Sequence, residues 1–223
     1  MKKVIRNQTG FTLLEIIVVL AVLGALAAML TPVVFRYLDD ANRTRANGDA
    51  RAIAASIQQM YKDTGRWPFY ADGDAKLTYT AGTDAAVLST NATCATGACT
   101  DATLPEDSTT GATWALATAK IDHMANHLIA NTPYGVTTAT LKYATTGSRA
   151  WKGPYLDRIP ALDAWGRSYV VNIGNADPDA EGATQKWVVV VSAGPDGNLD
   201  TLANATGVSN PQPGGDDIVA RAK

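Results

Sequence analysis

A group of acidic side chains near the C-terminus has a spacing that is typical of cation chemistry. Asp196, Asn198 and Asp200 alternate along the chain like the oxygen ligands at positions 1, 3 and 5 of an EF-hand calcium loop. An EF-hand is nevertheless excluded, because Thr201 occupies the position at which the sharp turn requires glycine. Gly207 likewise stands where the bidentate glutamate belongs. A cation here must therefore be held by another arrangement.

A loop that folds back on itself is that other arrangement. The acidic pair Asp216-Asp217 follows in the same C-terminal region, and such a loop would bring it close to Asp196. Carboxylates held together repel one another unless a cation lies between them, and Ca²⁺ accepts flexible sets of oxygen ligands. The sequence thus predicts a calcium site. The alternative is a surface turn rich in glycine, proline and aspartate that binds no ion.

A single carboxylate interrupts the apolar stretch from Phe11 to Leu30. As a helix this stretch is about 30 Å long, which matches the hydrocarbon core of a bilayer. Glu15 at the centre of a spanning helix would cost roughly 2–3 kcal/mol or more. One explanation is local, because Thr12 and Glu15 match the capping box S/T-x-x-E and a negative charge suits a helix start. The other explanation is a specific charged partner.

The N-terminal segment as a whole has two plain interpretations. Its basic residues Lys2, Lys3 and Arg6 precede an apolar run, as in a cleavable signal peptide with Ala25-Leu26-Ala27 as its cleavage site. The mature chain would then start at Ala28, as an exported calcium-dependent enzyme or binding module. In the second interpretation the run is a membrane anchor, and the basic residues hold the N-terminus in the cytoplasm.

The cysteines and histidines do not form a recognisable catalytic set. Cys94 and Cys99 lack the CxxC spacing of redox and zinc sites, and no second pair completes a tetrahedral site. Outside the cytoplasm they are expected to form one short disulfide, and otherwise a reduced, inert pair. His123 and His127 are spaced as in H-E-x-x-H, but Met124 replaces the glutamate. We therefore expect them to be incidental residues on a helix surface, and the protein not to be an enzyme.

One long helix is expected to carry the N-terminal residues. The apolar pattern predicts it from Thr12 to Asp63, where Gly65 and Pro68 stop it, with Pro32 loosening its hydrogen bonding inside. Its first half is apolar all round and its second half is amphipathic. A single chain would bury the second half against its own domain and leave the first half to lipid.

The rest of the chain predicts a small mixed domain, so the fold class is α+β. The 223 residues are 46% hydrophobic and 18% charged with a net charge of −2, which excludes a disordered chain and a strongly basic nucleic-acid binder. Residues 78–113 predict loops and short strands, and residues 113–131 predict a helix. Two strands are expected at residues 168–173 and 186–192. The second is nearly all apolar and is therefore expected to be central.

The residues Gly10-Phe11-Thr12-Leu13-Leu14-Glu15 resemble the N-terminal signature of type IV pilins and of type II secretion pseudopilins. A basic leader ends in glycine, and phenylalanine, glutamate and an apolar helix follow in the same order. The helix exit at residues 61–68 is similar to that of the major pseudopilins of type II secretion. Residues 153–160 and 163–169 also resemble segments of the major pseudopilins, although Ala164 replaces the usual proline.

The resemblance implies roles for three N-terminal residues. A prepilin peptidase would cut between Gly10 and Phe11, and the new N-terminus at Phe11 would be methylated. Glu15 would pair with the N-terminal amine of a neighbouring subunit during filament assembly. A costly buried carboxylate is then compensated only in the correct register. Capping and pairing are compatible, one before assembly and one after it.

The resemblance also extends to a calcium loop. The implied ligands are two side chains, two backbone carbonyls and one additional carboxylate: Asp196 and Asp216, Ala193 and Asn198, and Asp217. Asp200 and Asn204 are weaker candidates, and an insertion around residues 204–213 lengthens the loop.

These expectations divide the chain into five regions. They are a prepilin leader, a transmembrane polymerisation helix, its amphipathic continuation, a variable insert, and a C-terminal antiparallel sheet with the acidic loop: residues 1–10, 11–35, 36–68, 69–154 and 155–223.

The implied function is that of a structural subunit of a type II secretion pseudopilus. Its implied partners are copies of itself in a helical filament, minor pseudopilins, the prepilin peptidase and the inner-membrane assembly platform, with Ca²⁺ as a structural ion and no nucleic acid. The implied location is the bacterial inner membrane, with a single span and a periplasmic C-terminal domain. The alternative is a subunit of a surface type IV pilus, although such major pilins usually carry a cysteine pair around a C-terminal loop.

Overall fold

The computed structural model describes most of the chain. The described residues are 10–68, 87–95, 98–107, 114, 121–135, 142–173, 188–201 and 213–222. They divide into two compact units, with the boundary between Ala41 and Asn42. Each unit is described by itself.

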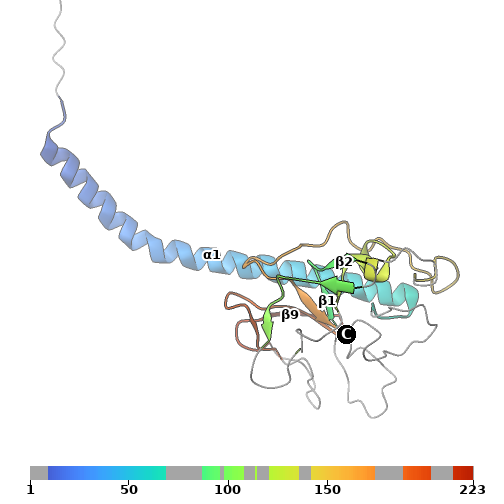
Figure 1. Ribbon diagram of the computed structural model, residues 1–223. Coiled ribbons are helices and arrows are strands. Elements are labelled where there is room, and N and C mark those ends of the chain that lie inside the picture. The colour runs from blue at the N-terminus through green and yellow to red at the C-terminus, as the bar shows by residue number, and fades with distance from the viewer. Residues whose placement is uncertain are drawn as a thin grey trace, which may run out of the picture. The chain divides into compact units, whose positions relative to one another are not determined.

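A single helix, α1, runs from Leu13 to Thr64 and enters both units (Figure 1). The long helix that the sequence predicts is thereby confirmed. It ends because Gly65 adopts a positive φ of 69°, which glycine tolerates, and the Gly65 N–H donates to the Tyr61 carbonyl at 2.7 Å. Pro32 lies inside the helix, as expected.

The first unit contains the apolar half of α1. Every residue from 10 to 38 is exposed, including all 14 of the leucine, isoleucine and valine side chains in this range. This part of α1 has a mean hydropathy of 2.8 over its most apolar window and is long enough to cross a membrane. An apolar surface of this size in water is unfavourable, so the segment requires lipid or other helices around it.

The second half of α1 packs against the sheet of the second unit. Its buried side chains recur every three or four residues, which places them on one face of the helix. That face joins the larger of two apolar cores, together with Leu88, Val171 and Val190 from the sheet. The helix residues at its centre are Ala46, Ala50, Ile53, Ile57 and Met60.

Shortening Ile57 to valine is expected to lower the free energy of unfolding by about 1 kcal/mol, because a fully buried methylene is lost from this core. In a chain of this size that is a fall in melting temperature of about 2–4 °C. Thermal unfolding of the full chain in a mild detergent, followed by tryptophan fluorescence, measures it. The exposed neighbour Gln58, changed to alanine, is the control and should leave the melting temperature nearly unchanged.

The main sheet has five strands in the order β5-β1-β6-β7-β9. All of its pairs are antiparallel except β1 with β5, which is parallel. The strands are β1 (Val87–Ser89), β5 (Ile121–His123), β6 (Val170–Asn172), β7 (Val189–Ser192) and β9 (Ile218–Arg221). Two small pairs complete the described strands: β2 (Thr93–Ala95) with β3 (Ala98–Thr100), and β4 (Glu106–Asp107) with β8 (Asn198–Leu199).

The two strands expected near residues 168–173 and 186–192 are confirmed as β6 and β7. β7 lies inside the sheet, as expected, and all four of its residues are buried. Val190 contributes to the larger core, whereas Val189 and Val191 contribute to a second core on the opposite face with Leu199. Because both faces are covered, the strand is continuously apolar rather than alternating.

The prediction of a helix at residues 113–131 is wrong for the described part of that range. Residues 121–123 form strand β5, and only Ala125–Leu128 form a helix, α2, followed by the 3₁₀ turn η1 (Pro133–Gly135). The region expected to be a variable insert therefore supplies two strands, β1 and β5, to the main sheet. The overall class is α+β, with a long apolar helix packed through its second half on an antiparallel-rich sheet.

Candidate functional site

The start of α1 carries the residues expected to be processed and to assemble. The Glu15 N–H donates to Thr12 Oγ1 at 3.2 Å, and Glu15 Oε2 accepts from the Thr12 N–H at 3.1 Å. These reciprocal contacts are those of a capping box. Thr12 Oγ1 is also 3.2 Å from Glu15 Oε2. Glu15 therefore stabilises the first turn of the helix within one chain.

This capping leaves the residues before the helix available. Phe11 is 84% exposed, and Gly10 is also exposed immediately before it. The Gly10–Phe11 bond is thus exposed ahead of the helix cap, and proteolysis concentrates at exposed chain near a terminus. Pairing of Glu15 with the amine of another subunit stays a prediction.

The acidic loop brings three carboxylates together. Asp196, Asp200 and Asp216 each offer an oxygen within 4.8 Å of the others. Asp196 and Asp200 flank strand β8, and Asp216 comes from the segment before β9. The Asp196 N–H donates to Asp216 Oδ2 at 3.3 Å, which links the two sides of the loop. The spacing of oxygens suits a hard cation with oxygen ligands, such as Ca²⁺.

Three glycines make this close approach possible. A Cβ at Gly215, which has a φ of 47°, would lie 2.1 Å from Asp200 Oδ2. A Cβ at Gly214 would lie 2.2 Å from the Asp200 carbonyl oxygen. A Cβ at Gly194, which has a φ of 66°, would lie 2.6 Å from the Asp216 carbonyl oxygen. Side chains at these positions would push the two sides of the loop apart.

The other residues proposed as ligands are placed differently. Asp217 Oδ2 accepts from the Thr201 N–H at 2.6 Å, so this carboxylate supports the backbone of the loop. Its Oδ1 is buried without a hydrogen-bond partner among the described residues, and burial raises the pKa of Asp217 to about 6. Ala193 is fully buried, and Asn198 is half-buried in β8. Asn204 lies outside the described residues.

The sequence made Asp200 only a weaker candidate ligand, yet in the structure Asp200 joins the cluster in place of Asp217. Asp217 was a possible additional ligand, but it follows a turn closed by its own N–H on the Gly214 carbonyl, and its Oδ2 accepts from the Thr201 N–H instead. The signal that favours Asp200 was present in the pair Gly214-Gly215, because two adjacent glycines allow another segment to approach the backbone closely.

A turn after the cis peptide bond Gly153-Pro154 holds the acidic loop against the sheet. Asp163 Oδ1 accepts from the N–H groups of Trp165 and Arg167, both at 2.9 Å. Its Oδ2 accepts from Ser192 Oγ at 2.7 Å, at the end of β7. The Ser192 hydroxyl in turn accepts from the Gly194 N–H at 3.4 Å. One buried carboxylate thus connects this turn with the start of the acidic loop.

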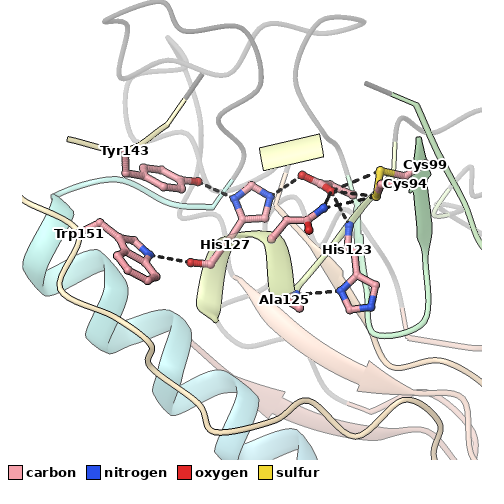
Figure 2. Close-up of polar contacts among 9 residues, drawn as sticks. Cys94, Cys99, His123, Ala125, His127, Tyr143 and Trp151 are labelled. Atoms are coloured by element: carbon pink, nitrogen blue, oxygen red, sulfur yellow. Dashed lines mark hydrogen bonds and ion pairs between the residues drawn. A yellow bond between two sulfur atoms is a disulfide. The ribbon is translucent and has the colours of Figure 1, made fainter. Parts of the chain in front are cut away.

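A second polar cluster surrounds the Cys94–Cys99 disulfide (Figure 2). The two cysteines face each other across the β2–β3 hairpin. Asp122 of β5 is fully buried, and its Oδ1 lies 3.4 Å from Cys94 Sγ and 3.3 Å from Cys99 Sγ. Because the sulfurs are bonded to each other, they cannot act as thiolate ligands for a metal ion.

The two histidines are not incidental residues on a helix surface, which corrects the expectation from the sequence. His127 is fully buried, with Nε2 at 2.7 Å from Asp122 Oδ2 and Nδ1 at 2.6 Å from the Tyr143 hydroxyl. His123 accepts the Ala125 N–H at Nδ1, and burial holds the pKa of His123 below its usual value. The histidines are separated by the change from strand to helix at Met124.

No spacing rule would have found this cluster in the sequence. Asp122 and His127 are close because β5 ends where α2 begins, and Tyr143 approaches from a separate segment. Asp122, His127 and Tyr143 lack an exposed nucleophile next to them among the described residues, since the cysteines are bonded. The buried hydrogen bonds that link Asp122, His127 and Tyr143 order the core around the hairpin.

Comparison with known proteins places the N-terminal part of the chain among pilin-like proteins. The family model of the prokaryotic N-terminal methylation motif matches residues 5–31. Over 68 residues the chain is 44% identical to the type II secretion system core protein G of Pseudomonas aeruginosa, covering 30% of this chain and 48% of the relative. The corresponding protein of Dickeya chrysanthemi is 35% identical over 68 residues, or 30% of this chain and 44% of the relative.

A pilin is also among the relatives. The toxin coregulated pilin of Vibrio cholerae is 32% identical over 69 residues, which is 31% of each chain. No solved structure matches the chain. The chain spans about half or less of the length of the relatives that it matches. The resemblance to type IV pilin-like and pseudopilin-like proteins is thus shown at the methylation motif and over a stretch of fewer than 80 residues.

Proposed function

We propose that this pilin-like chain is a structural subunit of a type II secretion pseudopilus. One observation carries the proposal: α1 joins an exposed apolar segment, with a capped start at Thr12, to a half that is packed in a folded domain. Such a helix can be anchored in lipid as a single chain and can pack against other copies in a filament. The match to secretion proteins G supports the pseudopilus.

Assembly would move the apolar half of α1 from lipid to a bundle of identical helices. Glu15 lies in this segment and is costly in hydrocarbon without a partner. After cleavage behind Gly10, the amine of Phe11 in a neighbouring copy supplies the opposite charge. Because only one register brings the two charges together, the pair sets the axial position of each subunit.

The proposal includes a location and a set of partners. The helix spans the bacterial inner membrane once, and the sheet domain faces the periplasm, in agreement with the basic residues before the span. The prepilin peptidase, minor pseudopilins and the assembly platform in the inner membrane act on it there. The filament contributes mechanically to protein export, and the subunit performs no catalysis.

We also propose a structural Ca²⁺ at the acidic loop, held by the carboxylates of Asp196, Asp200 and Asp216. The ion would offset the repulsion among these side chains and join the β8 side of the loop to the segment before β9. Backbone carbonyls of Ala193 and Asn198 are candidates to complete the oxygen set. Asp217 supports the loop through Thr201.

The mature N-terminus tests the filament proposal. We expect purified filaments to consist of subunits that begin at Phe11 and carry one methyl group on its amine, because cleavage and methylation precede assembly. Intact-mass analysis and N-terminal peptide sequencing measure this. A mature chain that starts at Ala28 would instead identify an ordinary signal peptide and overturn the proposal.

A second candidate is a subunit of a surface type IV pilus. The match to the toxin coregulated pilin is the observation that favours it. In both cases the processed residue is Phe11, so the location of the filament separates the two. Filaments that extend from the cell surface under native expression would indicate a pilus, whereas filaments confined to the periplasm would indicate a pseudopilus.

A further inference from the structure

The Cys94–Cys99 disulfide lies directly against a buried carboxylate (Figure 2). Asp122 Oδ1 is within 3.4 Å of both sulfurs. Because disulfide sulfurs carry no hydrogen, neither contact is a hydrogen bond, and the sulfurs do nothing to neutralise the charge of the carboxylate. Asp122 therefore opposes negative charge on either sulfur, whereas Asn126 Nδ2, which donates to Cys94 Sγ at 3.4 Å, favours it on Cys94 alone.

The carboxylate is held firmly in this position. Its Oδ1 accepts from the backbone N–H of His123 at 2.6 Å and from Asn126 Nδ2 at 2.7 Å. Its Oδ2 is 2.7 Å from His127 Nε2, and the ring of His127 is fixed on its other side by Tyr143. Asp122 is fully buried, so the carboxylate cannot swing away into solvent when charge develops on the sulfurs.

The disulfide is only partly covered by the surrounding chain. Cys94 and Cys99 are only half-buried, and the hairpin that they join is exposed at Thr93 and Thr100. We expect a small thiol to reach the sulfurs without unfolding of the domain. Protection, if it exists, must come from the charge next to the bond.

We propose that Asp122 shields the Cys94–Cys99 disulfide against reduction by thiolates. A thiolate attacks one sulfur and forms a new S–S bond, while the Cys94–Cys99 bond breaks and its electron pair leaves on the other cysteine sulfur. A second thiolate then attacks the mixed disulfide, so that two thiols are oxidised to one small disulfide and both cysteines are reduced. The first step spreads a negative charge over three sulfurs, and two of them touch Asp122.

Electrostatics in this setting determine the direction of the effect. A like charge a few ångströms away opposes the transition state, and it does so more strongly in a partly buried site than in water. An anionic thiol meets the same repulsion on approach, whereas a cationic thiol is attracted. Shielding thus predicts that the rate of reduction depends on the charge of the reductant.

The test compares three monothiols on the full chain in detergent: cysteamine, which is cationic, 2-mercaptoethanol, which is neutral, and 2-mercaptoethanesulfonate, which is anionic. Rates are corrected for the thiolate fraction of each and followed by alkylation and mass spectrometry. In the native chain we expect cysteamine to react at least about tenfold faster than mercaptoethanesulfonate. Equal corrected rates in the native chain would overturn the proposal without any variant.

Asp122→Asn removes the charge and keeps the shape. The amide oxygen can still accept from Asn126 and His123, and the amide nitrogen can donate to His127 Nε2 in the other ring tautomer. We expect reduction by 2-mercaptoethanol to become at least about tenfold faster and the difference between the charged thiols to shrink to about threefold or less. Asp101→Asn is the matched control, since among the described residues the Asp101 carboxylate accepts hydrogen bonds from Ser89, Ser168 and Thr103 and from neither cysteine.

A purely structural role for Asp122 gives a different result. Loosening of the hairpin would accelerate all three thiols by the same factor and leave their ratio as in the native chain, which would contradict shielding. A rate in the native chain that does not depend on thiol concentration would also contradict it, because reduction would then require prior opening of the domain.

Discussion

Replacing Glu15 with leucine is expected to abolish filament assembly, while membrane insertion and removal of the leader continue. Leucine extends the apolar surface of α1 and leaves the residues at the cleavage site unchanged. The variant loses the one charge between Phe11 and Leu30 that could select the register of neighbouring helices. Electron microscopy of shear or periplasmic fractions, with immunoblotting for the processed chain, measures both parts of the prediction.

Two further variants separate the charge from the helix cap. Glu15→Gln keeps a side-chain oxygen that can accept from the Thr12 N–H, so the capping box survives but the charge is lost. Thr12→Val removes the hydroxyl that accepts from the Glu15 N–H and keeps the charge. We expect the glutamine variant to fail in assembly and the valine variant to assemble. Normal filaments from Glu15→Gln would mean that capping alone explains Glu15.

The long helix was predictable from the sequence because its evidence is local. The apolar residues, the cap at Thr12 and the stop at Gly65 all lie within the helix or beside it. Strands β6 and β7 were predictable for a similar reason, since a short apolar run bounded by turn residues is typical of a buried strand. The pairing of β6 with β1 and of β7 with β9 was not contained in either run.

Strand β5 could not be predicted because its evidence is distant in the sequence. Residues 121–123 form a strand only because they pair in parallel with Val87–Ser89, more than thirty residues earlier. The neighbouring apolar residues Met124 and Leu128 have helical spacing and are both buried, so the pattern was interpreted as one long helix. Parallel pairing needs a crossover, and nothing in residues 121–123 indicates which strand lies at its other end.

The candidate sites likewise divide into those whose evidence is local in the sequence and those whose residues are brought together only by the fold. The capping box depends on two residues three positions apart and was visible in the sequence. The acidic cluster depends on closure of a loop, and the sequence indicated Asp196 and Asp216 but favoured Asp217 over Asp200. The contact of Asp122 with the disulfide joins three strands and had no signal at all.

Removal of Ca²⁺ is expected to lower the melting temperature of the chain by about 5–11 °C. An ion present at about 100 times its dissociation constant stabilises the folded state by about 2.7 kcal/mol, and a chain of this size loses about 2–4 °C for each kcal/mol. The reason is that chelation leaves three carboxylates within 4.8 Å of one another without a cation between them. Thermal unfolding in calcium and in a chelator measures the difference.

Asp200→Asn tests this prediction most directly, because its effect on the melting temperature should have opposite signs with and without Ca²⁺. In a chelator the variant is expected to be at least as stable as the native chain, since one of three repelling charges is gone. In calcium it is expected to be less stable, because a charged ligand is gone. Asp157→Asn, at an exposed carboxylate outside the loop, is the matched control and should behave like the native chain in both conditions. Identical melting of the native chain with and without calcium would show that the cluster is a surface turn, and its three carboxylates would then need another source of compensation.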